Sequence, residues 1–270
     1  MNFERITLPT GAVITAYLHR ESEDMPNPLC KKRPAIIVCP GGAYLGTSIR
    51  EQDAPAAAFL NMGLQVFVLE YSVGEKVKNK QGMEELGRTV QLIRKNSEQW
   101  LVDPNKVLVL GFSAGGHLAA SLGVHWDDPE VISRCGAICG EQIRPDGLVL
   151  AYPVITAGKY THQLSIDTVS ADTNEDMSYW SLETQVNEKT PPAFIWHTME
   201  DALVPVENSF MFASALHRAG VPCECHFFVH GEHGMSVCTQ EVGSYSASVG
   251  VWVSLCKTWL EEQFGELIGC

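Results

Sequence analysis

The sequence has no long hydrophobic run and comparatively little positive charge. No window of the 270 residues approaches 18 consecutive apolar residues, so a membrane-spanning helix is not expected. The 19 basic side chains are outnumbered by 32 acidic ones, which gives a net charge of −13, and they form no basic stripe. A nucleic-acid partner is therefore not expected either. We interpret the acidic excess as a solvated surface.

Cysteine is present, but its spacing is not typical of a metal site. None of the nine cysteines forms a C-x-x-C pair, and several lie in apolar runs, where cysteine packs as a small hydrophobic residue. The nearest approach to a ligand cluster, residues 223–226, alternates like a strand and lacks a second ligand pair. We expect no metal and, since residues 1–5 contain no apolar signal core, a soluble, reduced and cytoplasmic protein.

Apolar runs alternate with helical patterns along the chain. An edge hairpin is expected over residues 3–20, followed by a loop over 21–33. Buried strands are expected at 35–39, 64–69, 107–110, 148–152, 193–197 and 223–229, and helices at 54–60, 83–100, 205–219 and 249–264. This alternation predicts an α/β fold: one domain, residues 1–270, with a mostly parallel sheet covered by helices on both faces.

The pattern Gly111-Phe112-Ser113-Ala114-Gly115 joins a predicted buried strand to a predicted helix. Residues 103–106 are expected to form the turn that leads into this strand. Strand, sharp turn and helix are the context of a nucleophile elbow, which holds a serine hydroxyl exposed above the sheet. The two glycines are required because a side chain at either position would collide with the neighbouring strand or helix. Ser113 is therefore the candidate nucleophile.

A serine nucleophile needs a base and a carboxylate that fixes the base, which follow it along the chain in this type of sheet. The loop after the strand at 193–197 offers Asp201, with Glu200 as the alternative. The loop after the last strand offers His233 between Glu232 and a glycine, whereas His230 lies nearer the strand and is expected to be buried. We choose Asp201 as the acid and His233 as the base.

Two other histidines, His117 and His197, are expected to be structural, because one lies on the nucleophile helix and the other at a strand end. Backbone N–H groups must also stabilise the oxyanion that forms on the substrate. Ala114 follows the nucleophile, and the segment 40–44 follows a buried strand with two glycines. On its own this segment is more typical of a tight turn, but together with the triad we interpret it as a source of these donors.

Five motifs in order along the chain resemble one known group. The sequence is similar to the α/β-hydrolase esterases described as acetyl esterases or acetyl xylan esterases, relatives of the hormone-sensitive-lipase-like carboxylesterases. The motifs are Pro40-Gly41-Gly42-Ala43-Tyr44, Gly111-Phe112-Ser113-Ala114-Gly115-Gly116-His117-Leu118-Ala119, Tyr152-Pro153-Val154, Pro191-Pro192-Ala193-Phe194 and Gly231-Glu232-His233-Gly234. The resemblance implies a catalytic triad of Ser113, Asp201 and His233.

The resemblance further implies that Gly42 and Ala43, together with Ala114, donate N–H groups to the oxyanion. Pro40 and Ala43 depart from the histidine and third glycine that many relatives carry at these positions. If the loop requires a positive φ at residue 43, Gly41 or Gly42 is the alternative donor. No cofactor is implied.

The implied activity is hydrolysis of short acyl esters, acetate foremost, on a small-molecule or oligosaccharide substrate such as acetylated xylan oligosaccharides. An amide or formamide hydrolase, or a small-peptide peptidase, would use the same residues. A non-catalytic binding protein of this fold is a third alternative, disfavoured because all three triad positions are filled. The oligomeric state is left open, and a homo-oligomer is compatible with the sequence.

Residues 154–190 do not follow the strand–helix alternation. An insertion at this point would lie over the carboxyl ends of the strands, where ligands bind in such sheets. We interpret it as a lid or an acceptor-binding segment; a plain surface excursion is the alternative. Three aromatic residues, Tyr44, Tyr160 and Trp180, are candidates for stacking on sugar rings, and Tyr44 is the one we assign to substrate binding.

Overall fold

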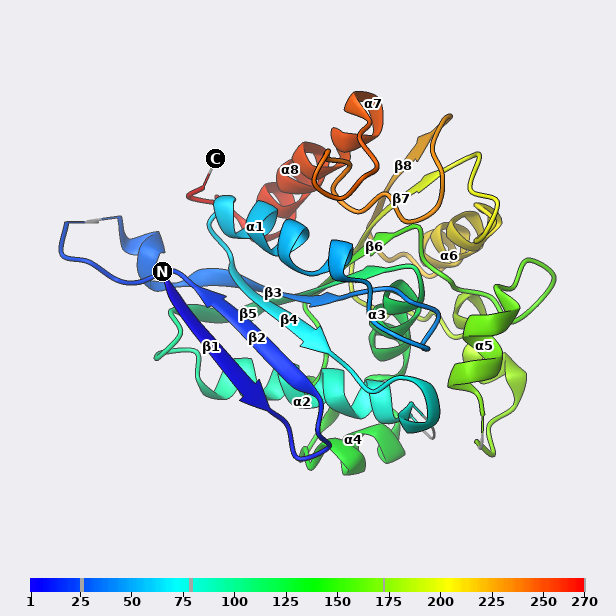
Figure 1. The fold of residues 1–270 in the computed structure, drawn as a ribbon. Helices are drawn as coiled ribbons and strands as arrows, with labels where there is room; N and C mark the ends of the chain where they lie inside the picture. The colour runs from blue at the N-terminus through cyan, green and yellow to red at the C-terminus, as the bar shows by residue number, and fades with distance from the viewer. Residues whose placement is uncertain (25–26, 78–79, 172, 270) are drawn as a thin grey trace.

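A single eight-stranded sheet forms the centre of the computed structural model, which describes residues 1–24, 27–77, 80–171 and 173–269 (Figure 1). The strands are β1 (Asn2–Thr7), β2 (Val13–Leu18), β3 (Arg33–Cys39), β4 (Gln65–Glu70), β5 (Val102–Phe112), β6 (Gly147–Ala151), β7 (Ala193–Thr198) and β8 (Cys223–Phe228). Their spatial order is β1-β2-β4-β3-β5-β6-β7-β8. β2 runs antiparallel to β1 and β4, and all other pairs are parallel. The predicted mostly parallel α/β sheet is confirmed.

The chain begins with the predicted hairpin. Asn2 pairs with Leu18 and Thr7 with Val13, and the connecting turn places Gly11 at a φ of 95°. A positive φ at this point is easily adopted by glycine because it has no Cβ. The loop that follows contains a short 3-10 helix, η1 (Pro28–Lys31). Residues 25–26 of this loop, which precede η1, lie outside the described residues.

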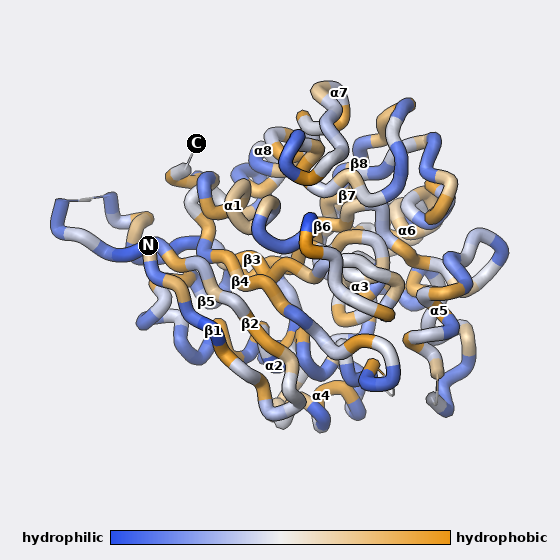
Figure 2. The backbone as a smooth tube through the Cα atoms, in the orientation of Figure 1, coloured by the Kyte–Doolittle hydropathy of each residue, from blue (hydrophilic) through white to orange (hydrophobic). Residues whose placement is uncertain are grey.

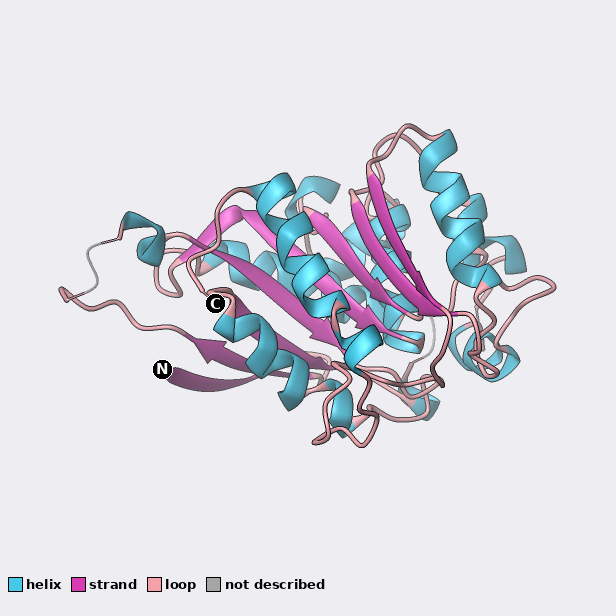
Figure 3. Cartoon of the chain, turned by 90° about the horizontal axis from the view of Figure 1, so that it is seen from above, coloured by secondary structure: helices cyan, strands magenta, loops and turns pink. Residues whose placement is uncertain are grey.

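Helices cover both faces of the sheet (Figure 3). They are α1 (Asp53–Asn61), α2 (Gln81–Lys95), α3 (Ala114–His125), α4 (Pro129–Cys135), α5 (Gln163–Val169), α6 (Glu207–Arg218), α7 (Ala247–Gly250) and α8 (Trp252–Phe264). Short 3-10 helices are η2 (Ile49–Glu51), η3 (Gly74–Lys76), η4 (Gly140–Gln142), η5 (Met177–Trp180) and η6 (Leu182–Thr184). Within the described residues, no helix combines the length and the apolar composition needed to cross a bilayer.

Alternate residues along each central strand pack into two different hydrophobic cores. Ile36 and Val38 belong to the core under α1 and α8, and Ile37 belongs to the core under α2 and α3. Successive side chains of a strand point to opposite faces, so an unbroken apolar run serves both layers. Most residues along β3 and β4 are accordingly hydrophobic, whereas residues in many outer loops are hydrophilic (Figure 2).

Three local predictions differ from the structure, one of them the helix expected over 83–100, which begins at Gln81 and ends at Lys95. Residues 103–106 were expected to be a turn, but they lie within β5, where the pairing with β3 shifts register between Arg33–Val102 and Ala35–Val107. Asp146 accepts the Val107 N–H at this irregular point. The helix expected over 249–264 is interrupted, since α7 ends at Gly250 and α8 begins at Trp252.

The segment 154–190, of which residue 172 lies outside the described residues, packs beside α3 and α6. Nε2 of His117 donates to the Trp180 carbonyl at 3.1 Å, and Nε2 of His125 donates to the Tyr179 carbonyl at 3.0 Å. The His125 and Tyr179 rings stack with centroids 3.8 Å apart. Much of the segment is thus fixed to the fold, and it approaches the candidate site at His162, just before α5.

Candidate active site

Ser113 occupies a strained turn between β5 and α3. Its φ is 52° and its ψ is −117°, in a region that residues with a side chain rarely adopt. A Cβ on Gly111 would lie 2.2 Å from the Gly115 carbonyl oxygen, and one on Gly115 would lie 2.1 Å from the Cys39 carbonyl oxygen. The two glycines therefore allow the close approach that the predicted elbow requires.

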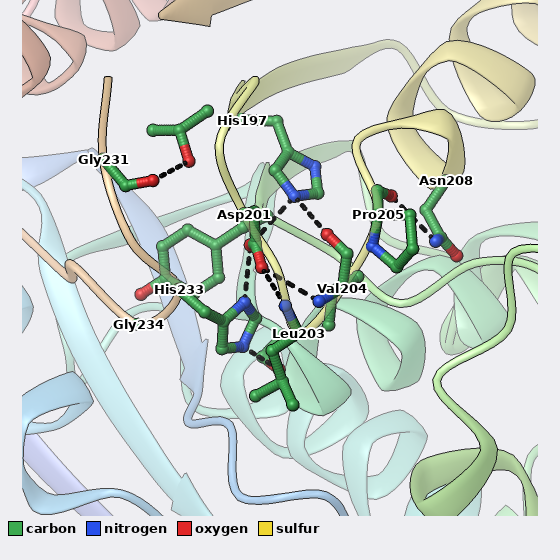
Figure 4. Close-up of polar contacts among 12 residues, drawn as sticks. His197, Asp201, Leu203, Val204, Pro205, Asn208, Gly231, His233 and Gly234 are labelled. Atoms are coloured by element: carbon green, nitrogen blue, oxygen red, sulfur yellow. Dashed lines mark hydrogen bonds and ion pairs between the residues drawn. The ribbon is translucent and has the colours of Figure 1, made fainter. Parts of the chain in front are cut away.

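Three predicted residues form a continuous hydrogen-bonded chain. Nε2 of His233 lies 2.8 Å from Oγ of Ser113, and Nδ1 of His233 lies 2.6 Å from Oδ2 of Asp201 (Figure 4). An ionised carboxylate only accepts hydrogen bonds, so Nδ1 carries the proton and Nε2 is left to accept the serine hydroxyl. The carboxyl ends of three parallel strands thus bring together residues 120 positions apart in the sequence.

Asp201 is buried and accepts four hydrogen bonds. Oδ1 accepts the N–H groups of Leu203 and Val204 at 3.0 and 2.9 Å, and Oδ2 accepts from His233 and His197. Burial alone would raise the pKa of Asp201, but the hydrogen bonds from His197 and His233 outweigh it and hold this pKa below its usual value. The carboxylate is therefore ionised at neutral pH.

His197 is a residue whose place in the site sequence reasoning missed. It is fully buried at the end of β7, with Nε2 3.1 Å from Oδ2 of Asp201 and 3.0 Å from the Val204 carbonyl oxygen. Both partners are acceptors, so Nε2 carries the proton, and Nδ1 accepts the Ser209 hydroxyl at 2.8 Å. The signal in the sequence was its position, four residues before Asp201 at the same strand end.

The loop after β3 takes an unusual backbone path. Gly42 has a φ of 134°, and Ala43 and Tyr44 have φ values of 54° and 59°. We expected that a positive φ at residue 43 would exclude Ala43 as a donor. This expectation is wrong, because the alanine adopts that conformation and retains its N–H. Gly41 is the weaker alternative, since its N–H donates to Oε2 of Glu51 at 2.7 Å. Gly42 and Ala43 border the same cavity as Ser113.

Three side-chain predictions are corrected by burial. Tyr44 is only 1% exposed, and its hydroxyl lies 2.9 Å from Nδ1 of His117, so its side chain belongs to the core rather than to a substrate surface. Trp180, within the insertion, is equally buried. His230, expected to be buried, has an 81% exposed side chain and pairs with Glu200 at 2.8 Å.

Glu51 is the second functional candidate that sequence reasoning missed. It is 3% exposed, in η2, within a segment whose polar composition is typical of a surface loop. Oε2 accepts the Gly41 N–H, and Oε1 accepts the Tyr152 hydroxyl at 2.7 Å. Burial raises the pKa of Glu51, opposed by these two hydrogen bonds and by nearby His233. Glu51 borders the cavity that contains Ser113.

A cavity of about 360 Å³ opens above Ser113 and His233. Its walls include Gly42 and Ala43 on one side, and polar side chains of the outer wall are Ser48, Arg50 and His162. Leu203, 54% exposed, supplies an apolar edge. In the described part of the chain, no three His, Cys, Asp or Glu side chains are grouped so as to bind a metal ion.

The sequence matches a known protein family and characterised proteins. Residues 24–216 match the BD-FAE family. The chain is 41% identical over 236 residues to endo-1,4-beta-xylanase B of Butyrivibrio fibrisolvens, covering 84% of this chain and 35% of that protein. It is 30% identical over 234 residues to the acetylxylan esterase of Xylanibacter ruminicola, covering 80% of this chain and 45% of that protein. The chain thus spans less than half the length of both relatives.

The fold is also similar to a solved structure. The acetyl ester-xyloside bifunctional hydrolase of Caldicellulosiruptor lactoaceticus superposes with a TM-score of 0.82 at 34% sequence identity. The match covers 96% of this chain and 90% of that chain.

Proposed function

This chain belongs to the BD-FAE family and has the α/β-hydrolase fold, and from that premise we propose that it is a serine esterase acting on short acyl esters of carbohydrates. The observation that carries the proposal is the chain of hydrogen bonds from Ser113 through His233 to Asp201 at the base of the cavity. A carboxylate that holds a histidine in the tautomer able to accept a serine proton is what nucleophilic acyl transfer requires.

The first half of the reaction forms an acyl-enzyme. Oγ of Ser113 attacks the ester carbonyl while Nε2 of His233 takes the hydroxyl proton, and the adjacent Asp201 carboxylate stabilises the resulting imidazolium. Negative charge develops on the carbonyl oxygen, where the N–H groups of Ala114, Gly42 and Ala43 act as donors. His233 then returns the proton to the leaving alcohol as the C–O bond breaks.

The second half releases the acid. A water molecule takes the place of the alcohol, His233 accepts its proton, and the hydroxide oxygen adds to the acyl carbon. Collapse of this second tetrahedral intermediate breaks the bond to Ser113, whose oxygen regains a proton from His233. The acid leaves, and the residues return to their starting protonation states.

The names of the relatives and the polar side chains in the cavity wall support an acetyl group on a sugar as the substrate. One relative is an acetylxylan esterase, another is a xylanase, and the superposed structure is an acetyl ester-xyloside hydrolase. Arg50 and His162 at the outer wall offer hydrogen-bond donors of the kind that sugar hydroxyls accept. We therefore propose acetylated xylan oligosaccharides as the substrate class.

The test is acetate release from acetylated xylo-oligosaccharides and from an aryl acetate, each paired with its amide analogue. Wild type should release acetate from both esters, and Ser113→Ala should lose about 10⁴-fold or more of the activity. Ser214→Ala, which removes an exposed hydroxyl on α6, is the matched control. Cleavage of the aryl ester alone would overturn the carbohydrate assignment, and faster cleavage of the amides would favour an amidase.

A further inference from the structure

Glu51 joins the two loops that the proposed reaction must keep in register. On one side its Oε2 accepts the N–H of Gly41, the residue immediately before the proposed oxyanion donors. A Cβ on Gly41 would lie 2.8 Å from this oxygen and 2.9 Å from Cβ of Ser113, so the Gly41 backbone is held between the carboxylate and the nucleophile. The position of the donors relative to Ser113 therefore depends on Glu51.

On the other side, Glu51 reaches the loop that carries His233. Its Oε1 accepts the Tyr152 hydroxyl, which in turn accepts the N–H of Ser236 at 2.8 Å. The Ser236 hydroxyl donates to the carbonyl of Arg50, the residue before Glu51, at 2.7 Å. Ser236, three residues after His233, is thus tied to the Glu51 segment through its N–H and through its hydroxyl.

The hydrogen bonds also identify the state of the carboxyl group. Both oxygens of Glu51 accept hydrogen bonds, as an ionised carboxylate does. If Glu51 donated to Tyr152 instead, the Tyr152 hydroxyl would receive two donors, the other from Ser236, and its own proton would lose its acceptor. An ionised Glu51 satisfies every group in this network.

We propose that Glu51 is a positioning residue for the esterase reaction: its carboxylate fixes the oxyanion loop to the His233 loop, and its negative charge favours the imidazolium that forms on His233. The inference rests on the proposed function. The Tyr152 ring, 5.0 Å from the His233 ring between centroids, lies in edge contact with the base. Glu51 therefore acts through Gly41, Tyr152 and the local field, without contacting the reacting atoms.

The groups around Glu51 and His233 determine how removal of the Glu51 charge changes the protonation of His233. The charged or titratable groups that face Glu51 are Arg50, Tyr71, Tyr152 and His233. Those that face His233 are Asp201, Glu51, Tyr152 and His162. A carboxylate raises the pKa of a neighbouring imidazolium, so removal of its charge lowers that pKa. Since the free base is the active form of His233, the acidic limb of kcat/KM would then move to lower pH.

The test compares wild type with Glu51→Gln and, as a charge-matched control, Glu98→Gln, an exposed residue before the start of β5. Glutamine keeps the size but places an N–H₂ group against either the Gly41 N–H or the Tyr152 hydroxyl. We expect Glu51→Gln to lower kcat for an aryl acetate about tenfold or more, with KM changed less than about threefold. We also expect the acidic limb to move down by about half a pH unit or more.

An unchanged kcat or an unmoved acidic limb in folded Glu51→Gln overturns the proposal, because a merely structural role would not move the limb. Tyr152→Phe provides a second test if Glu51→Gln fails to fold. It removes the hydroxyl that links Glu51 to Ser236 but keeps the ring, and it should lower kcat at constant KM; wild-type kcat overturns the proposal. Ser113→Ala distinguishes a failure of the proposed function from a failure of the Glu51 proposal. An active Ser113→Ala variant would refute the serine esterase function itself.

Discussion

His197 and His233 donate to the same oxygen atom of Asp201, at 3.1 and 2.6 Å. The buried His197 donor persists whatever the state of His233, because its other partners, the Val204 carbonyl and the Ser209 hydroxyl, hold its tautomer. Asp201 therefore keeps its orientation when its bond to His233 is disturbed. His197 thus fixes the Asp201 carboxylate, and the carboxylate in turn orients His233.

Replacement of His197 should weaken catalysis without removing it. His197→Phe keeps much of the volume but loses the donor to Asp201, and we expect kcat to fall about tenfold, the effect of one hydrogen bond to a charged group. His197→Gln, which retains a donor, should recover part of the loss. Steady-state kinetics on an aryl acetate measure both, and equal activity of wild type and His197→Phe would contradict the prediction.

The same variant should change acid stability. The folded-state pKa of Asp201 is held below its unfolded value, so its contribution to stability is present above the unfolded pKa and is lost as pH falls through the folded pKa. Loss of the His197 donor brings the folded pKa closer to the unfolded one. The acid-unfolding midpoint of His197→Phe should therefore lie at higher pH than that of wild type, as followed by circular dichroism.

Gly115→Ala should destabilise the fold by about 3 kcal/mol or more, because the added Cβ would lie 2.1 Å from the Cys39 carbonyl oxygen, a backbone atom that cannot move freely. Gly250→Ala is the matched control, since the nearest atom to its Cβ lies at an ordinary 3.5 Å. Urea unfolding of both variants measures the difference. Similar stabilities for the two would show that the elbow relaxes easily.

His117 should make the stability of the protein fall at mildly acidic pH. Burial lowers the pKa of His117 from 6.5 to about 4. Between these values the unfolded chain binds a proton that the folded protein does not, so stability is full above the unfolded pKa and decreases as pH falls toward the folded one. The contribution amounts to about 3 kcal/mol at pH 4.

Urea unfolding at several pH values between 7.5 and 4.5 measures this effect. Wild type should lose more stability over the range than His117→Gln, which has no group to titrate at that position. His217→Gln, at an exposed position on α6, is the control and should follow wild type. If His117→Gln and wild type lose stability in parallel, the folded protein binds a proton at His117 as readily as the unfolded chain does, which contradicts the prediction.

His162→Ala should affect an acetylated oligosaccharide more than a simple aryl acetate. Nδ1 of His162 lies 2.7 Å from the Ser165 hydroxyl, which orients the ring at the cavity wall. Loss of one hydrogen bond to a sugar hydroxyl should raise KM about fivefold. The exposed His230→Ala variant should leave both KM values unchanged. Equal KM values for the oligosaccharide in wild type and His162→Ala would show that His162 does not contribute to binding of the sugar.

The fold was predictable from strand periodicity, and the meeting of Ser113, Asp201 and His233 from the Gly-x-Ser-x-Gly pattern and from the order of nucleophile, acid and base along the chain. Each of the three follows the end of a parallel strand, and those ends lie along one edge of the sheet. Glu51 was not predictable in this way. It lies in a polar segment, and the hydroxyl that explains its burial belongs to Tyr152, 101 residues away.

Side-chain direction in irregular segments was the other limit. Tyr44 faces the core because residues 43 and 44 both adopt a positive φ, which no periodicity signals. His230 was expected to be buried because it is close to a strand, but β8 ends at Phe228 and the loop carries His230 outward. In loops, one backbone angle reverses a side chain, and local composition does not determine that angle.

The attachment of the insertion to α3 has a consequence for how such a protein diversifies. His117 and His125 donate to main-chain carbonyls of residues 180 and 179, and a carbonyl is present whatever amino acid stands there. Exposed positions along 154–190 can therefore change while the segment keeps these two anchoring points on α3. Substitutions beside His162 can then alter one wall of the cavity while the residues at its base stay as they are.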